Sequence, residues 1–368
     1  MKIAIVSSAG ESLVKFRGHL IQEWIRRGCD VWCISIEPSE KIGSEIAKLG
    51  AQYYQVDGSR TGTSIFEGIS MIQKYTTAFK YIQPDICFLY MSKPIAFGGI
   101  AAIRSRVNKI YVFQTGLEIA FYSKGVKNAF LRVVLKTLYR YVQNHAHVVF
   151  FMSHSDIERM LTWKCVKRDK ICYVDGSGVD MDKFEYYPLP KEAIVLMTAR
   201  LVWSKGIREY ANAAKIVKEK HPNTRFLLVG GIDENSEALS KEELDGLVAQ
   251  GIIEYMGYQK DVRPYLHMCS IFVLPSYHEG KGTAILEAQA VGRPIVTTLA
   301  PGCGETVIDN YNGLRVPIRN SIKLAEAIKY LVDNPDERER MSRNAYDYCK
   351  KTFDSRIIDK IISDKMGI

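Results

Sequence analysis

The sequence predicts an α/β protein made of two doubly wound parallel sheets. Short apolar runs, typical of buried strands, alternate along the whole chain with longer stretches whose apolar residues recur at helical spacing. This alternation is the pattern of βαβ units, whose strands lie parallel in one sheet. With 368 residues, of which 47% are hydrophobic, the chain is long enough for about two domains with full cores.

The first half begins with an expected strand, Lys2–Val6, followed by a turn that contains Gly10 and by a helix that ends at Gly28. In a first strand–helix unit, this turn is where the backbone would approach a ligand. The turn has no G-x-G-x-x-G motif, which argues against a dinucleotide-binding dehydrogenase. Further strands are expected over 31–34, 52–56, 86–90, 109–113 and 145–152, and helices over 41–49, 64–82 and 121–143.

The second half repeats the pattern and contains the stretch 274–296, which we expect to carry the chemistry. Its apolar start ends a buried strand, and a polar loop with two glycines leads into a helix over 283–291. Another strand, 295–298, follows the helix. The remaining expected strands are 193–197, 225–231 and 271–274, and the closing helices are 321–333 and 338–366.

Two carboxylates flank the loop of this stretch, Glu279 before the helix and Glu287 within it. Gly280 and Gly282 allow the backbone to approach a ligand, and the N–H groups of a helix start favour anions. Because carboxylates accept hydrogen bonds from hydroxyls, the set indicates a ligand with both phosphate and sugar, such as a nucleotide sugar. A helix that merely carries acids in its first turn to complement its dipole is the alternative.

Two cations, Arg200 and Lys205, lie in the loop after the strand 193–197. A guanidinium fork and an ammonium point charge at one loop suit a diphosphate. Two solvated loop charges are the other interpretation. These two residues, with Glu279, are the predicted catalytic residues. The two cations would stabilise the negative charge that develops on the diphosphate as it leaves.

Several motifs together resemble one family. The chain has Glu279 and Glu287 in an E-x7-E pattern, S-x-x-E-G before it, R-x4-K at Arg200, and G-V-D-x-x-x-F from Gly178. This set resembles the retaining glycosyltransferases of family 4. The resemblance implies the GT-B fold, with two doubly wound Rossmann-like domains facing a cleft. It also implies domains over 1–187 and 188–345, with a C-terminal helix, 346–368, folding back on the first domain.

The resemblance implies that the first acid, Glu279, lies near the donor sugar and that the second, Glu287, binds the ribose. Relatives often have an apolar residue and then Pro after the E-G of the motif. Here Lys281-Gly282 stands at that place. The segment around Tyr258 matches the place where relatives hold the base. The predicted donor-binding residues are Gly10, Arg200, Lys205, Tyr258, Gly280, Lys281, Gly282, Thr283 and Glu287.

The end of the strand 109–113 resembles a bacterial subgroup that acts on undecaprenyl-diphosphate-linked sugars. Many relatives have a His after this strand, whereas this chain has Thr115-Gly116-Leu117-Glu118. Thr115, Gly116 and Glu118 are therefore the predicted acceptor-binding residues, and for Glu118 a solvent-facing position in the loop is the alternative. The expected reaction moves a sugar, an N-acetylhexosamine or hexose, from a UDP-sugar to a polyprenyl-diphosphate-linked saccharide.

Basic residues concentrate in the first half of the chain. Residues 1–187 contain 25 Lys and Arg against 17 Asp and Glu, whereas residues 188–368 contain 25 against 24. The helix 121–143 has five basic residues and no acid, with Arg132, Lys136 and Arg140 four apart on one face. An anionic membrane surface is the expected partner of such a helix, and an ordinary surface helix is the alternative.

A nucleic-acid partner is not expected, because the chain has no recognition motif of that kind. The eight cysteines form no CxxC pair, and no acid or cysteine completes a ligand set with His145 and His147, so we expect neither a metal ion nor a cofactor. Without a run of about 20 apolar residues or a signal peptide, the expected location is the cytoplasm, peripheral on the inner face of the cell membrane.

Overall fold

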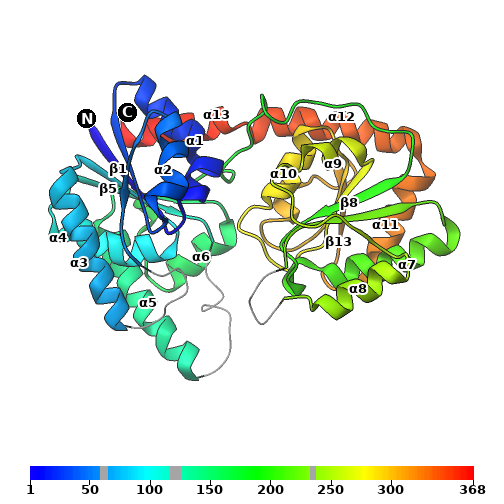
Figure 1. The fold of residues 1–368 in the computed structure, drawn as a ribbon, viewed down its shortest axis with the longest axis horizontal. Helices are drawn as coiled ribbons and strands as arrows, with labels where there is room; N and C mark the ends of the chain where they lie inside the picture. The colour runs from blue at the N-terminus through cyan, green and yellow to red at the C-terminus, as the bar shows by residue number, and fades with distance from the viewer. Residues whose placement is uncertain (59–64, 117–125, 233–237) are drawn as a thin grey trace. The chain divides into compact units, whose positions relative to one another are not determined.

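The computed structural model describes residues 1–58, 65–116, 126–232 and 238–368, and Figure 1 shows its two parts. One compact unit consists of Met1–Ser177 together with Arg356–Ile368, and the other consists of Gly178–Ser355. The first change of unit thus comes earlier in the chain than the predicted boundary after residue 187. The reason is that the segment after Ser177 belongs to the second unit, where the Val179 amide donates to the Phe353 carbonyl at 2.8 Å.

The first unit contains a parallel sheet of seven strands in the order β3-β2-β1-β4-β5-β6-β7. All five residues of the strand from Ile86 to Tyr90 are buried, as expected for a central strand that is covered on both faces. The strands are β1 (Lys2–Val6), β2 (Asp30–Ser35), β3 (Gln52–Gln55), β4 (Ile86–Tyr90), β5 (Lys109–Gln114), β6 (Val148–Phe151) and β7 (Ile171–Tyr173).

Helices cover both faces of this sheet and give two separate cores (Figure 1). One core contains Leu20 and Trp24 of α1 with Ile362 of α13, and the other contains Tyr75 of α3 and Tyr139 of α5. The helices are α1 (Gly10–Arg26), α2 (Ser39–Lys48), α3 (Ile65–Ile82), α4 (Gly99–Arg104), α5 (Val126–His145), α6 (His154–Thr162) and α13 (Ser355–Met366), with a short π-helix η1 (Pro94–Gly98) and a short 3-10 helix η3 (Arg168–Lys170).

The second unit contains a parallel sheet of six strands in the order β10-β9-β8-β11-β12-β13. Helices α7 and α11 pack against each other, as do α10 and α12. The strands are β8 (Ile194–Thr198), β9 (Arg225–Val229), β10 (Glu254–Tyr255), β11 (Ile271–Leu274), β12 (Ile295–Thr298) and β13 (Gly313–Val316). The helices are α7 (Ile207–Lys220), α8 (Lys241–Ala249), α9 (Arg263–Met268), α10 (Thr283–Ala290), α11 (Ser321–Asp333) and α12 (Pro335–Thr352), with turns η4 (Trp203–Lys205) and η5 (Gly304–Thr306).

The fold class is therefore the predicted one, two doubly wound parallel sheets with helices. Two expected elements differ in the structure. The expected strand 145–152 begins only at Val148, because α5 continues to His145, whose Nδ1 lies 2.7 Å from the Tyr141 carbonyl one helical turn earlier. The expected closing helix 338–366 is two helices, α12 and α13, separated after Thr352.

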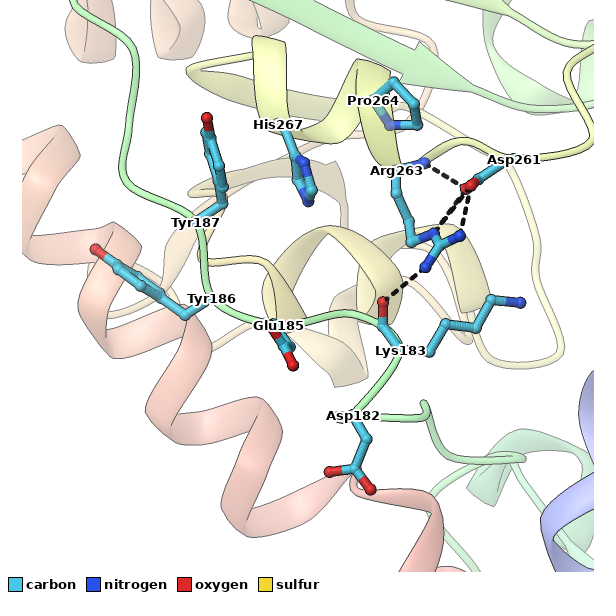
Figure 2. Close-up of a pocket in the computed structure, with 9 residues that line it drawn as sticks. All are labelled: Asp182, Lys183, Glu185, Tyr186, Tyr187, Asp261, Arg263, Pro264 and His267. Atoms are coloured by element: carbon cyan, nitrogen blue, oxygen red, sulfur yellow. Dashed lines mark hydrogen bonds and ion pairs between the residues drawn. The ribbon is translucent and has the colours of Figure 1, made fainter.

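The segment that enters the second unit lies along α9, and the two line an open pocket of about 420 Å³, drawn in Figure 2. Tyr187 stacks on His267 with 4.4 Å between the ring centroids. The Arg263 guanidinium forks onto the carboxylate of Asp261, with NH2 to Oδ2 at 2.6 Å, and this hydrogen bond lowers the pKa of Asp261 to about 2. The Arg263 guanidinium also lies 3.5 Å from the Lys183 carbonyl, so this contact and the stack of Tyr187 on His267 join the segment to α9.

Arg293, at the turn between α10 and β12, holds the same segment from the other side. Its guanidinium is fully buried and donates to the carbonyls of Cys269 at 2.8 Å, of Val291 at 2.9 Å and of Tyr187. Burial lowers the pKa of Arg293, so its hydrogen bonds to these carbonyls must compensate the lost hydration.

We predict that Arg293→Met lowers the free energy of unfolding by about 3 kcal/mol, because three carbonyl groups, two of them in buried hydrogen bonds, lose a charged donor. Urea unfolding followed by circular dichroism measures the change. The matched control is Arg343→Met, since the Arg343 side chain is 72% exposed, and it should change stability by less than about 0.5 kcal/mol. Equal unfolding midpoints for the two variants would contradict the role of Arg293.

Candidate functional site

The strand order of the second unit determines where a site can form. The sheet changes direction at the neighbouring strands β8 and β11, since one half of the unit is built outward from each. In open parallel sheets, ligands bind beyond the carboxyl ends of the strands at such a point. The loops that follow these two strands are 199–206, which contains both predicted cations, and 275–282, which contains Glu279.

The structure brings Lys205 and Glu279 together. The Lys205 ammonium donates to Oε1 of Glu279 at 2.6 Å, and the hydroxyl of Ser276 donates to the same oxygen at 2.7 Å. The two charged side chains are 17% and 15% exposed, so they are shielded from bulk water but reachable by a ligand. An ion pair in such surroundings is stronger than one on the open surface.

Close backbone contact between the two loops makes this pair possible. The amide of Tyr277 donates to the Ser204 carbonyl at 2.9 Å. Gly206 adopts a φ of +77°, and a Cβ there would lie 2.2 Å from the Pro275 carbonyl oxygen. Any other residue at 206 would therefore push the loops apart, and Lys205 would move away from Glu279.

A third loop, 299–305 after β12, is bound to the loop of Glu279. The Glu279 amide donates to the Pro301 carbonyl at 3.0 Å, and the Gly282 amide donates to the Gly302 carbonyl at 2.9 Å. Gly302 has a φ of +74°, and a Cβ there would meet the Glu279 carbonyl oxygen at 2.2 Å. The three loops thus form one connected surface at the carboxyl edge of the sheet.

Lys281, a predicted donor-binding residue, is directed into the unit. Its side chain is 2% exposed, with the ammonium 3.6 Å from Oε2 of Glu305 and 5.7 Å from the ring centroid of Phe353. The ammonium is therefore not presented to solvent, and contact with a donor at this position falls to the backbone of Gly280 and Gly282.

Helix α10 starts at this loop, with Thr283 as its first residue and Gly282 as its N-cap. No side-chain oxygen caps the start, and its first turn contains no acid, which excludes the interpretation that acids in this turn serve the helix dipole. Glu287 lies in the next turn and is buried, at 7% exposure. The start of α10 can therefore offer backbone N–H groups to an anion beside a buried carboxylate.

The remaining predicted residues of the second unit are more exposed. Arg200 is exposed directly beyond β8, and the Tyr258 side chain is 75% exposed in the loop after β10. The Gly230 amide donates to the Gly257 carbonyl at 2.9 Å, so the loop of Tyr258 is joined to the loop after β9. Both residues thus lie at the same edge of the sheet as Glu279.

In the first unit, Gly10 does not leave room beside the helix start. A Cβ at Gly10 would lie 2.6 Å from Oε2 of Glu37, and that oxygen accepts a hydrogen bond from the Glu11 amide at 2.9 Å. The carboxylate of Glu37 therefore occupies the N-terminal end of α1, where the prediction had the backbone approach a ligand.

The predicted acceptor residues lie beyond β5. Thr115 and Gly116 are half-buried, and the Gly116 carbonyl accepts a hydrogen bond from the Gln114 amide group at 2.8 Å. Glu118 lies outside the described residues.

The basic face predicted on α5 is partly engaged by the loop that follows α6. Arg140 donates to the carbonyls of Trp163 at 2.7 Å and Lys164 at 3.1 Å, and the Lys136 ammonium lies 4.0 Å from the Trp163 ring centroid. Val133, on the same helix, is 62% exposed. The face therefore combines cations held by the loop with an exposed apolar side chain.

Cysteine chemistry is not a feature of the site. All eight cysteines are free and buried. Burial, with the Glu279 carboxylate nearby, raises the pKa of the Cys303 thiol to about 12, so that it is no thiolate nucleophile near neutral pH. Within residues 1–58, 65–116, 126–232 and 238–368, no group of three or more His, Cys, Asp or Glu side chains is arranged to hold a metal ion.

Sequence reasoning did not select three residues with a structural role, Ser276 and Glu305 at the loops of the second unit and Glu37 at the start of α1 in the first unit. Ser276 is part of the S-x-x-E-G motif, so the motif itself could have identified it. Glu305 lies in a glycine-containing turn that the sequence shows, but its ion pair with Lys281 depends on tertiary contacts. Glu37 has no signal in the sequence, because its role follows from the packing of β2 against α1.

Two family models match the chain. The model described as glycosyl transferases group 1 matches residues 180–348, which carry all the second-unit loops described above. The model described as glycosyl transferase 4-like matches residues 2–153. Together they cover most of both units.

Solved structures of low identity have the same fold. A glycosyltransferase from Rickettsia africae is 20% identical with a TM-score of 0.78, over 99% of this chain and 98% of that one. The Anabaena protein HepE in complex with UDP and glucose is 16% identical with a TM-score of 0.80, over 100% and 99%. These likenesses confirm the predicted GT-B fold class.

Among curated proteins, the chain is 30% identical over 359 residues to the N,N'-diacetylbacillosaminyl-diphospho-undecaprenol alpha-1,3-N-acetylgalactosaminyltransferase of Campylobacter jejuni. That alignment covers 94% of this chain and 93% of the relative. The capsular polysaccharide biosynthesis glycosyltransferase CapM of Staphylococcus aureus is 24% identical, over 97% and 94%. The predicted resemblance is thus confirmed, and the chain belongs to the family 4 glycosyltransferases, as an enzyme with a group 1 glycosyl transferase domain and a 4-like N-terminal domain.

Proposed function

We propose that this glycosyltransferase moves a sugar, an N-acetylhexosamine or a hexose, from a UDP-sugar to a hydroxyl of a polyprenyl-diphosphate-linked saccharide. The main support for the proposal is the similarity, over nearly the whole chain, to a transferase whose name specifies a diphospho-undecaprenol-linked acceptor. The structural neighbour that holds UDP and glucose supports a UDP-linked donor. Bacterial surface-glycan or glycoprotein-glycan biosynthesis is the proposed setting.

The loops of the second unit supply the groups that such a donor needs. The Glu287 carboxylate is proposed to accept from the ribose hydroxyls, and Glu279 to accept from the transferred sugar. Lys205 is held beside Glu279 at 2.6 Å, and Arg200 extends from the neighbouring strand end. Both cations, with the N–H groups at the start of α10, stabilise the charge that develops on the departing diphosphate.

We propose retention of configuration by attack on the same face that the leaving group vacates. The acceptor oxygen bonds to the anomeric carbon while the bond from that carbon to the diphosphate oxygen breaks. The hydroxyl proton passes to the diphosphate. The family resemblance supports this stereochemistry, and the cations and the helix start replace a metal ion in stabilising the leaving group.

We also propose that the first unit attaches to the anionic inner face of the cell membrane through α5, where the lipid-linked acceptor would be found. The described helices include none that is long and apolar enough to cross a membrane. The basic excess of residues 1–187 and the exposed Val133 beside Arg132 and Lys136 support a peripheral contact.

The proposed reaction is tested by incubating the chain with a polyprenyl-diphosphate-linked saccharide and single UDP-, GDP- or ADP-sugars, with and without EDTA. We expect transfer from a UDP-sugar at an unchanged rate in EDTA, because cations of the protein stabilise the diphosphate. Chromatography of the released lipid product measures transfer. Transfer from none of the donors would refute the proposed function, whereas a loss of rate that magnesium or manganese restores would refute only its metal independence.

Four alanine variants test the proposed donor contacts. Arg200→Ala, Lys205→Ala and Glu287→Ala should each weaken UDP binding about tenfold or more, because each removes a charged hydrogen-bonding group. Glu279→Ala should leave UDP binding nearly unchanged and lower the transfer rate by at least about tenfold, since its partner is the sugar. Calorimetry with UDP and turnover assays measure the two effects. The control is Lys220→Ala, because the Lys220 side chain is 66% exposed in an ion pair with Asp333.

If Glu279→Ala weakens UDP binding as strongly as Glu287→Ala, the assignment of the two acids is wrong. Unchanged UDP affinity and rate in both cation variants would remove the diphosphate role of Arg200 and Lys205.

Membrane attachment is tested by sedimentation with vesicles that contain anionic phospholipid. Replacing Arg132, Lys136 and Arg140 with Glu should lower binding roughly a hundredfold, since each basic residue near an anionic surface contributes on the order of 1 kcal/mol. High salt should also lower binding.

The control for this experiment replaces three exposed lysines of the second unit, Lys215, Lys350 and Lys351, with Glu, which changes the net charge equally. Because Arg140 also holds the 163–164 loop, thermal melting of both triple variants shows whether the fold is kept. Equal vesicle binding by the two folded variants would make α5 an ordinary surface helix.

A further inference from the structure

The pair Lys281 and Glu305 places a charge where the family pattern has none. After E-G, relatives often have an apolar residue, and the buried position of Lys281 explains why an apolar side chain suits it. A buried ammonium is costly unless an opposite charge compensates it. We therefore expect the buried Lys281 ammonium to have a function that compensates the cost of its burial.

The partner carboxylate is only partly satisfied inside the unit. Oε2 of Glu305 is buried, lies 3.6 Å from the Lys281 ammonium and accepts no hydrogen bond from the described part of the chain. The Glu305 side chain as a whole is nevertheless 28% exposed. Its exposed part is therefore not Oε2, so the carboxylate is held at one oxygen by a buried cation while the rest of the side chain can meet a ligand.

The backbone around Glu305 is fixed from two sides. The loop before it is bound to the loop of Glu279 through Pro301 and Gly302, as described above. After it, the Thr306 carbonyl accepts a hydrogen bond from the buried amide group of Gln289 on α10, at 2.8 Å. Glu305 thus belongs to the same connected surface as Glu279, the acid proposed to contact the transferred sugar.

We propose that Glu305 recognises a hydroxyl of the transferred sugar and that Lys281 acts as its positioning residue, which keeps the carboxylate in place. This inference rests on the proposed transfer from a UDP-sugar. A carboxylate that accepts from a hydroxyl discriminates well between sugars, because a donor without that hydroxyl, or with the opposite orientation, leaves the carboxylate without this hydrogen bond. The pair determines donor specificity and does not touch the leaving diphosphate.

The test compares Glu305→Gln, Glu305→Ala, Lys281→Met and the double variant Lys281→Met with Glu305→Gln. The donor is the UDP-sugar that the wild-type chain uses, and kcat/KM for this donor, the Kd for UDP and the melting temperature are measured. Both Glu305 variants should lower kcat/KM about tenfold or more and change the Kd for UDP less than about threefold, since UDP lacks the sugar.

Lys281→Met should lower both the melting temperature and kcat/KM, because it leaves the carboxylate without its cation. The double variant should regain the melting temperature, since no unpaired buried charge remains, but should not regain kcat/KM. The matched controls are Lys323→Met and Lys323→Met with Glu326→Gln, at an exposed ion pair of the same unit that is 2.6 Å long. They should leave all three quantities nearly unchanged.

Three results would overturn the inference. The first is a wild-type kcat/KM in Glu305→Gln and Glu305→Ala, and the second is a loss of UDP affinity in these variants as large as their loss of kcat/KM. The third is recovery of kcat/KM together with the melting temperature in the double variant. The last result would show that the pair only supports the loop. Because Glu305→Gln keeps the shape of the side chain, it provides the test if Lys281→Met does not fold. A wild-type chain that transfers no sugar from any UDP-sugar would refute the proposed function and this inference with it, whereas failure in the variants of an active chain refutes only the inference.

Discussion

The close approach of three loop backbones is the constraint on which the candidate site depends. Gly206 and Gly302 both adopt left-handed backbone conformations, and at both positions a Cβ would lie 2.2 Å from a carbonyl oxygen of the loop that carries Glu279 or leads to it. The ion pair of Lys205 and Glu279 is a result of this approach, because the two residues come from different strand ends. The positions of the charged side chains therefore depend on the backbone geometry of the loops.

The two units use the same topology differently. In the second unit the start of α10 has no side-chain cap and stays available, with a buried carboxylate one turn further along. In the first unit the start of α1, the helix that follows β1, is closed by Glu37, whose carboxylate accepts a hydrogen bond from the Glu11 amide. The start of α10 in the second unit thus favours a bound anion. At the start of α1 in the first unit, the carboxylate of Glu37 opposes one.

The sequence was sufficient to predict the fold class, since buried parallel strands such as β4 and β11 appear as uninterrupted apolar runs. It also predicted which loops carry the charges, because Arg200, Lys205 and Glu279 lie between an apolar strand run and the next helix. It did not predict that Lys281 turns inward, because a lysine in a polar loop is normally solvated and only tertiary packing against Phe353 and Glu305 shows otherwise. The extension of α5 to His145 was not predicted, because its last residues, Gln143-Asn144-His145, are polar and show no helical spacing of apolar side chains.

The burial of all eight thiols has a practical consequence for work on this protein. Burial raises the pKa of several of them, including Cys269 and Cys303 to about 12, so both accessibility and ionisation protect them from alkylating reagents in the folded state. A single cysteine introduced on the surface would therefore be the preferred attachment point for a fluorophore or spin label without removal of the native ones. Conversely, the rate at which the native thiols react would report how often each unit opens.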